Sequence, residues 1–516
     1  MSGKVRIELV PLGVSLEVEQ GSPLRELLAP YGVEFACDGD SPCGACRIKL
    51  LEGALPVTRQ DAEIFTSQEL NEGWRLACRA RAESNLKLNC SPWEMVILTD
   101  DTPLPSLGHS GLGVAVDLGT TTVVAQLFDL RTGILLDQRS ALNPQSVRGA
   151  DVMSRVRFAL SSSELTLVIR EFIGSLIAEM SNGREAEIAE VLIVGNTVMH
   201  HLFAGLDVEP LAHVPFVSPH LGEQHFSAES LNWKLAASAN VHFLPCIGGF
   251  VGSDILAGVF AVGLHNRDDL CALIDLGTNG EIVLGNRKRM LCASTAAGTA
   301  FEAGSIKMGM RASTGAVSRV FVRDGELECG VVGSGEPRGI CGSGLVDAVA
   351  AGLDLGAILP SGRFHNGARA FPLTGPVQLW QPDVRELQLA KAAIASGLRI
   401  LLDHWGARIG DVKQVFLAGA FGNYVRPSSA TRIGMLEMPV ERITAAGNTA
   451  LRGAKLLLGR KWPAELDHIE HVGLASDPRF QDTFIDCLGF PDRPNLDVAP
   501  AKREDEVAPR PGCDSI

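Results

Sequence analysis

Four cysteines near the start of the chain have the spacing of a metal-ligand set. Cys37, Cys43, Cys46 and Cys78 follow the pattern C-x5-C-x2-C-x31-C, and the first three lie in a glycine-rich stretch. Three thiolates in one loop and one remote thiolate are a ligand set typical of an iron–sulfur cluster. Zinc is the alternative, but structural zinc sites usually contain two close cysteine pairs, and only Cys43 and Cys46 form one. The spacing therefore favours a [2Fe–2S] cluster bound by these four residues.

A second motif, Asp-Leu-Gly-Thr, occurs twice, beginning at Asp117 and at Asp275. Each copy lies between two apolar runs, which is typical of two strands joined by a tight hairpin turn. A carboxylate at the end of a buried strand is costly unless it has a partner. A turn with free backbone N–H groups, threonine hydroxyls and a nearby carboxylate suits a phosphate group and its Mg²⁺ ion. Two such turns predict a nucleotide that is held from both sides.

Length and charge exclude some classes of protein. A chain of 516 residues is too long for one hydrophobic core and predicts several domains. Its net charge of −14 argues against a nucleic-acid partner, because phosphate contacts need clustered lysine and arginine. The first residues lack the apolar segment of a signal peptide, and the longest apolar region, 241–264, is interrupted by Pro245 and Asp254. We therefore expect a cytoplasmic protein with no membrane partner.

The order of predicted elements divides the chain into five segments. Residues 1–93 form short alternating strands around the cysteines, and 94–112 contain the proline, glycine and charge of a linker. Strands and helices alternate from residue 113 onward, and the second Asp-Leu-Gly-Thr motif begins a second half. We therefore expect two α/β lobes, 113–270 and 271–490. Residues 491–516 combine proline with many charges and are predicted to be disordered.

Further polar and small residues follow predicted strands. Gly195-Asn196-Thr197 comes after an apolar strand, and the stretch Gly419 to Gly422 comes after another. Ligands of α/β proteins bind at the carboxyl ends of strands, so the loop at Gly195-Asn196-Thr197 is expected near a bound ligand. Candidates whose roles the sequence leaves open are Asn196, Thr197, Glu281 and Glu302.

Residues 1–93 resemble a [2Fe–2S] ferredoxin domain of the β-grasp fold, because of the cysteine spacing and the Arg-Leu-Ala-Cys element that ends at Cys78. The two Asp-Leu-Gly-Thr turns and the later Gly-Ala-Phe-Gly loop resemble the actin-like ATPases, whose two α/β lobes are ribonuclease H-like. This resemblance implies that Asp117 and Asp275 are catalytic and hold Mg²⁺ through water or orient the attacking water. The ATP-binding residues it implies are Gly119, Thr120, Thr121, Thr122, Gly277, Thr278, Asn279, Gly280, Gly419 and Gly422.

A ferredoxin domain, a linker and an actin-like ATPase in one chain resemble the reductive activators of corrinoid proteins. The stretches 195–201, 274–281 and 339–345 look like signatures of that family. The resemblance implies an enzyme that couples ATP hydrolysis to the one-electron reduction of a Co(II) corrinoid protein of a methyltransferase system to Co(I). It implies the corrinoid protein and an upstream electron donor as partners. A homodimer is an expectation from the resemblance alone.

Two other functions are compatible with the same motifs. One is an ATP-coupled electron donor to another low-potential metalloenzyme. Donors of that kind use a [4Fe–4S] cluster at a dimer interface, and the chain has no second close cysteine pair. The other is a small-molecule kinase with a redox-sensing ferredoxin domain, which needs an acceptor pocket that the sequence does not identify. The sequence does not reveal which corrinoid protein or electron donor is served.

Overall fold

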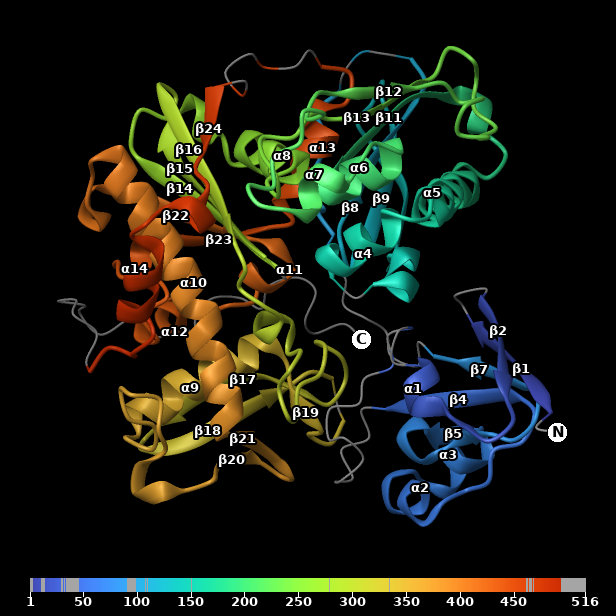
Figure 1. Cartoon of the computed structure of the whole chain (residues 1–516), viewed down its shortest axis with the longest axis vertical. Coiled ribbons are helices and arrows are strands. Elements are labelled where there is room, and N and C mark those ends of the chain that lie inside the picture. Colours follow the sequence, from blue (N-terminus) through green and yellow to red (C-terminus); the bar gives the residue numbers. More distant parts are fainter. Residues whose placement is uncertain are drawn as a thin grey trace.

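The computed structural model describes residues 3–10, 14–28, 31, 33, 46–90, 99–106, 108, 110–149, 151–277, 279–333, 335–460, 463, 466 and 468–492. Figure 1 shows a small N-terminal unit in blue and two larger α/β units that lie side by side above and to its left. No helix within the described residues is long and apolar enough to cross a membrane.

The N-terminal unit is built on a five-stranded mixed sheet. Its elements are β1 (Lys4–Val10), β2 (Val14–Glu19), β3 (Ser22–Pro23), α1 (Leu24–Leu28), β4 (Arg47–Glu52), α2 (Arg59–Ile64), α3 (Ser67–Asn71), β5 (Trp74–Leu76), β6 (Arg81–Ala82) and β7 (Leu86–Asn89). The sheet order is β2-β1-β7-β4-β5, with β1 parallel to β7 and antiparallel to β2. Alternate residues of β1 are buried in the core, as the period of two requires. This arrangement is the expected β-grasp fold.

The first α/β lobe is a six-stranded sheet with helices packed against it. Its elements are β8 (Leu112–Leu118), β9 (Thr122–Asp129), β10 (Leu135–Leu142), α4 (Val152–Ala159), α5 (Glu164–Ser181), β11 (Ile188–Gly195), α6 (Thr197–Ala204), α7 (Glu209–Ala212), β12 (Gln224–Phe226), β13 (Asn240–Phe243) and α8 (Ser253–Val262). The order is β10-β9-β8-β11-β13-β12. The first three strands form an antiparallel meander, and β11 and β13 continue the sheet parallel to β8.

The second lobe repeats this plan. Its sheet contains β14 (Cys271–Leu276), β15 (Gly280–Asn286), β16 (Arg289–Thr295), β22 (Gln414–Ala418), β23 (Ile443–Gly447) and β24 (Ile469–His471) in the order β23-β22-β14-β15-β16-β24. Again three antiparallel strands are followed by two that lie parallel to the first. Both lobes therefore have the strand order of the ribonuclease H-like fold, and the predicted fold class is confirmed. Its helices are α10 (Gln381–Trp405), α11 (Gly419–Gly422), α12 (Pro427–Arg432), α13 (Thr449–Leu457) and α14 (Phe480–Asp486).

An additional layer is inserted between β16 and α10 of the second lobe, at the lower left of Figure 1. It contains β17 (Ala316–Arg323), β18 (Glu326–Val331), β19 (Gly339–Ile340), α9 (Gly342–Asp354), β20 (Ala370–Thr374) and β21 (Val377–Trp380). β19 pairs with β17, and α9 begins directly after it. This short strand therefore positions the beginning of α9, which contributes to the site described below.

Helix α13 connects the two lobes. It follows β23 of the second lobe but packs against α8 and contacts β8 and β11 of the first. A Cβ atom at Gly453 of α13 would lie 1.9 Å from the Ala257 carbonyl oxygen of α8, so the two helix backbones approach as closely as glycine permits. The same helix holds the segment before β8, because the Lys455 ammonium donates to the carbonyl oxygens of Asp100 and Thr102 at 2.7 and 2.6 Å.

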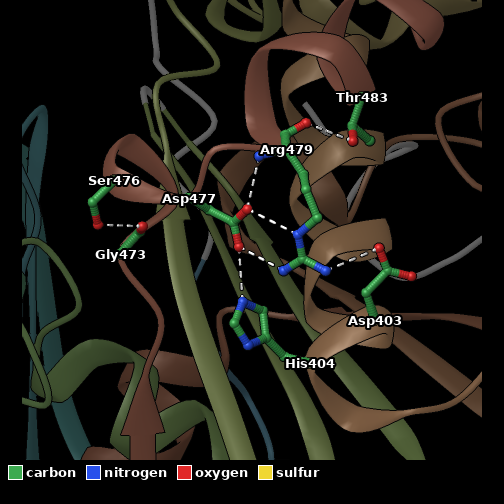
Figure 2. A network of polar contacts seen from close by, with 7 residues as sticks. All are labelled: Asp403, His404, Gly473, Ser476, Asp477, Arg479 and Thr483. Carbon is green, nitrogen blue, oxygen red and sulfur yellow. Dashed lines mark hydrogen bonds and ion pairs between the residues drawn. The ribbon is translucent and has the colours of Figure 1, made fainter.

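The last described segment is fastened to the end of α10 by a polar network (Figure 2). Asp477 accepts from the Arg479 guanidinium at 2.6 Å and is 2.8 Å from His404 Nε2. Arg479 also lies 3.4 Å from the Asp403 carboxylate. These bonds hold α14 beside α10. Of the tail for which disorder was predicted, 491–516, all but residues 491 and 492 lie outside the described residues.

Candidate functional site

The first Asp-Leu-Gly-Thr turn joins β8 to β9 and is held from behind by a buried asparagine. The Gly119 N–H donates to the Thr122 carbonyl oxygen at 2.9 Å, which closes the turn. The side-chain amide of Asn143 donates to the Gly119 carbonyl oxygen at 2.8 Å, and its backbone N–H donates to the Thr121 carbonyl oxygen at 2.9 Å. Because two of its carbonyl groups are engaged on this side, the turn has a fixed shape.

The second turn joins β14 to β15 and is one residue shorter than the first. The Gly277 N–H donates to the Asn279 carbonyl oxygen at 3.0 Å, and Asp275 pairs across the hairpin with Glu281. Thr278 lies outside the described residues. Gly280 permits close packing, because a Cβ atom there would lie 2.0 Å from the Ile394 side chain of α10. Helix packing therefore positions the second hairpin.

A cavity of about 290 Å³ lies between the two turns. Seven of the predicted ATP-binding residues line it, from both lobes: Gly119, Thr120, Thr121, Thr122, Gly277, Asn279 and Gly419. Both predicted catalytic carboxylates, Asp117 and Asp275, are also on its wall. The described residues Gly280 and Gly422 are not among the lining residues. The fold therefore brings the two halves of the sequence repeat to one cavity.

Four acidic side chains line this cavity: Glu281, which is buried, and the half-buried Asp117, Asp254 and Asp275. Burial raises the pKa of Asp117 to about 6, although a hydrogen bond from Asn448 favours its ionised form. Burial, and then the charge of Asp117, raise the pKa of Asp275 to about 7. Burial and the neighbouring aspartates raise the pKa of Asp254 to about 8 and hold that of Glu281 well above its usual value. Such a desolvated, mutually repelling set of oxygen ligands fits a divalent cation such as Mg²⁺.

Two asparagines that begin helices hold the first turn and its aspartate. Asn196 caps α6 and donates from its amide nitrogen to Thr120 Oγ1 at 2.9 Å. Asn448 caps α13 and donates to Asp117 Oδ2 at 2.8 Å. Thr197 points elsewhere, since its buried hydroxyl donates to the Gly248 carbonyl oxygen at 2.6 Å.

The sequence reasoning missed two of these residues, Asp254 and Asn448. Asp254 follows a glycine-rich stretch at the beginning of α8, which is a weak signal for a site. Asn448 lies 331 positions from Asp117, so no local pattern could have linked them. Glu281 and Glu302, whose roles the sequence left open, both line the cavity.

Glycine is required where the chain passes the side chain of Asp275. Gly419 has φ of +86°, and a Cβ atom there would lie 2.3 Å from Asp275 Oδ1. Nearby, the rings of Phe301 and Phe421 stack with centroids 4.6 Å apart, and both line the cavity. The cavity thus has an acidic end between the turns and an aromatic surface beside Gly419.

Two of the four predicted cluster ligands are described, and the fold brings them together. Cys46 directly precedes β4, and Cys78 lies in a short 3-10 helix after β5. The Ala77 N–H donates to the Cys46 carbonyl oxygen at 2.8 Å, so the two segments lie side by side. Cys37 and Cys43 lie outside the described residues.

The N-terminal unit adjoins the wall of the cavity. Burial, and then the charge of the nearby Arg338, lower the pKa of Arg47 to about 9. Arg338 directly precedes β19, and the three residues that follow β19, Cys341 to Ser343, line the cavity. One short strand therefore separates the cavity from the cysteine-bearing sheet.

Comparisons with protein families agree with this arrangement. Residues 7–83 match the 2Fe-2S iron-sulfur cluster binding domain, 112–267 match the RACo middle region, and 269–499 match the C-terminal domain of RACo, the ASKHA domain. The chain is therefore a ferredoxin domain fused to an actin-like domain of the ASKHA class.

Similar proteins show to which family within the ASKHA class the chain belongs. The corrinoid activation enzyme RamQ of Eubacterium limosum is 35% identical over 417 residues, which cover 72% of this chain and 69% of RamQ. The [Co(II) methylated amine-specific corrinoid protein] reductase of Methanosarcina barkeri is 27% identical, over 73% of this chain and 77% of that protein. A solved structure, the reductive activator for corrinoid,iron-sulfur protein, has a TM-score of 0.65 and 25% identity, and the similarity covers 96% of this chain and 100% of that one. The chain belongs to the family of reductive activators of corrinoid proteins, as the sequence motifs predicted.

Proposed function

We propose that this protein returns an inactive Co(II) corrinoid protein of a methyltransferase system to Co(I), with an electron carried by its N-terminal domain and driven by ATP hydrolysis. The observation that carries the proposal is a cavity between two Asp-Leu-Gly-Thr turns in the same chain as a cysteine-bearing sheet, whose Arg47 feels the charge of Arg338, directly before β19. The names of RamQ and of the Methanosarcina barkeri reductase support the corrinoid substrate.

Electron transfer of this kind needs an energy source. The Co(II)/Co(I) couple lies below a typical ferredoxin, so the electron must move uphill. For a one-electron step, each deficit of about 59 mV costs a factor of about ten in the equilibrium constant. ATP can supply that difference only if its binding or hydrolysis changes the affinity for the corrinoid protein or its cobalt environment. Helix α13 suits this coupling, because it spans both lobes and its first residue follows Asn448.

The two turns provide the phosphate site in this proposal. Gly119–Thr122 and the turn residues 277–279 would hold the phosphates with backbone N–H groups and hydroxyls, and Gly419 would let the chain pass the adenosine. Gly280 and Gly422 do not line the cavity and would act only by shaping these loops. Asp117 and Asp275 would hold Mg²⁺ through water, and Asp275 would orient the attacking water. When bound, Mg²⁺ supplies the positive charge that the acidic end of the cavity requires.

The electron site consists of Cys37, Cys43, Cys46 and Cys78. When bound, the [2Fe–2S] cluster supplies a one-electron carrier between an upstream donor and the corrinoid protein. We assign residues 1–93 to this domain, 94–112 to a linker, and 113–270 and 271–490 to the two lobes of the ATPase.

The proposal is tested with the cluster-loaded full-length chain, a low-potential reductant and a Co(II) corrinoid protein, under anaerobic conditions. We expect the Co(I) absorbance to rise only with hydrolysable ATP. Equal Co(I) formation without ATP, or none with it, would contradict the proposal. Release of a phosphorylated metabolite instead would favour the small-molecule kinase.

Cysteine variants separate the electron site from the ATP site. Cys46→Ser should abolish both the cluster spectrum and cobalt reduction while ATP hydrolysis continues. Cys90→Ala is the matched control, since Cys90 is a buried cysteine of the same domain outside the four-cysteine pattern, and burial alone raises its pKa to about 12. An intact cluster spectrum in Cys46→Ser would remove Cys46 from the ligand set.

A further inference from the structure

Two histidines and a glutamate meet at the outer edge of the first lobe, where Figure 1 places β12 and β13 next to β11 at the top. His225 in the middle of β12 pairs with His242 on β13, and their rings stack with centroids 5.7 Å apart and planes 7° apart. Glu223, just before β12, has one carboxylate oxygen 2.6 Å from His242 Nδ1 and the other 3.7 Å from His225 Nε2. The potential ligand atoms of all three side chains lie within 4.8 Å of one another.

A second carboxylate supports this cluster from within the sheet. His242 Nε2 is 2.9 Å from Glu190 Oε1 on β11, and the other oxygen of Glu190 accepts from the Gly459 N–H at 2.6 Å. One nitrogen of the buried His242 ring thus faces Glu223, while the opposite nitrogen donates to Glu190. Histidines that bind metals usually have such a carboxylate partner on their second nitrogen, because it fixes the tautomer and orients the ring.

We propose that Glu223, His225 and His242 form a site for a divalent metal ion of the zinc class, with Glu190 as the supporting carboxylate. Two imidazoles and one carboxylate are borderline ligands that suit Zn²⁺ better than Mg²⁺ or Ca²⁺. His225 and Glu223 face solvent, so water completes the coordination. The ion would fasten β12, an edge strand of only three residues, to the sheet and, through Glu190, to the segment that follows α13.

The alternative to a metal ion is a protonated His242 that forms ion pairs with Glu190 and Glu223. Burial lowers the pKa of His242, but its bonds to Glu190 and Glu223 outweigh burial and raise the pKa to about 9. A site that holds only a proton would be an ion-pair network without metal affinity, and this is the alternative that the experiment must exclude.

The test measures bound zinc in the full-length, cluster-loaded chain equilibrated with a competing chelator. We expect one equivalent of Zn²⁺, with a dissociation constant at least about 100-fold higher in His225→Asn. Glu190→Gln should weaken binding about 10–100-fold, as loss of a supporting carboxylate does. His213→Asn is the matched control, since His213 is an exposed histidine 3.1 Å from Glu209, and its zinc binding should equal that of the wild type.

Spectroscopy of the wild-type chain gives a second readout that does not depend on the folding of any variant. Co²⁺ in this site should show d–d bands without thiolate charge transfer, which separates it from metal bound by cysteines. Equal zinc binding by wild type and His225→Asn, or Co²⁺ bands with thiolate charge transfer only, would overturn the proposal in favour of a protonated ion-pair network. Neither readout involves ATP or cobalt reduction, so this test and that of the proposed function fail independently.

Discussion

The two Asp-Leu-Gly-Thr hairpins have one backbone plan but different surroundings. In the first lobe Asp117 receives a hydrogen bond from Asn448, and the turn is tied to Asn143 and Asn196. In the second lobe, within the described part of the chain, the Asp275 carboxylate receives no hydrogen bond, and its pKa is raised further. The comparison indicates different roles. Asp117 is held in place by Asn448, whereas no described residue donates a hydrogen bond to either oxygen of Asp275, which suits the proposed role of orienting water.

Both lobes have a glycine at the end of the strand that lies beside the hairpin. Gly195 is the last residue of β11 and pairs with Leu118 of β8, and a Cβ atom there would lie 2.5 Å from the Leu118 carbonyl oxygen. Gly419 has the equivalent place beside β14, where a Cβ atom would lie 2.8 Å from the Leu276 carbonyl oxygen. Glycine at this position is therefore a requirement of the shared fold, and the contact with the aspartate oxygen is particular to Gly419.

The largest effect that separates the hairpins should come from the aspartates themselves. If Asp275 orients the attacking water, Asp275→Asn should lower the rate of ATP hydrolysis about 10²–10⁴-fold, the usual contribution of a general base. The cluster spectrum should be unchanged, because the cysteines lie in another domain. Asp117→Asn is the comparison variant and should mainly weaken Mg²⁺-dependent ATP binding. A rate for Asp275→Asn close to the wild-type value, measured by phosphate release, would reverse the assignment of roles.

A smaller effect should follow from filling the space beside Asp275. Gly419→Ala places an alanine in the left-handed region at a cost of about 1–2 kcal/mol. It also forces a Cβ atom against Asp275, and such overpacking typically lowers the free energy of unfolding by a further amount of about 1–3 kcal/mol. Gly447→Ala is the matched control, since Gly447 has φ of +75° but open space around it. Thermal denaturation should show the greater loss for Gly419→Ala, and only that variant should lose ATP hydrolysis. Equal losses in both would mean that backbone strain alone matters.

Local patterns explain how much of this site could be predicted from the sequence. Apolar runs that flank Asp117 and Asp275, and the glycines after them, specify hairpins whose turns meet once the lobes pair. Asp254 and Asn448 could not be found this way, because their proximity to the turns arises from the packing of α8 and α13 across the two lobes. Gly280 is an example of the opposite error, a residue that local sequence predicts for the site but the fold places elsewhere. Its motif suggests a phosphate contact, whereas the fold packs it against Ile394 of α10.

The smallest predicted effect tests whether Asn448 tunes Asp117 or only caps α13. Asn448→Ala removes a helix cap, which costs about 1 kcal/mol, and also the hydrogen bond that favours ionised Asp117. Without that bond the pKa of Asp117 rises above about 6, so the acidic limb of the pH profile of kcat/KM for ATP should move to higher pH. Asn196→Ala also removes a helix cap, but its amide contacts the Thr120 hydroxyl, so it should lower stability by a similar amount and leave the acidic limb in place. If both variants shift the acidic limb of the pH profile equally, the pKa of Asp117 depends on any loss of support for the first turn and not on its bond to Asn448. The difference in hydrogen bonding between Asp117 and Asp275 would then not account for different roles of the two hairpins.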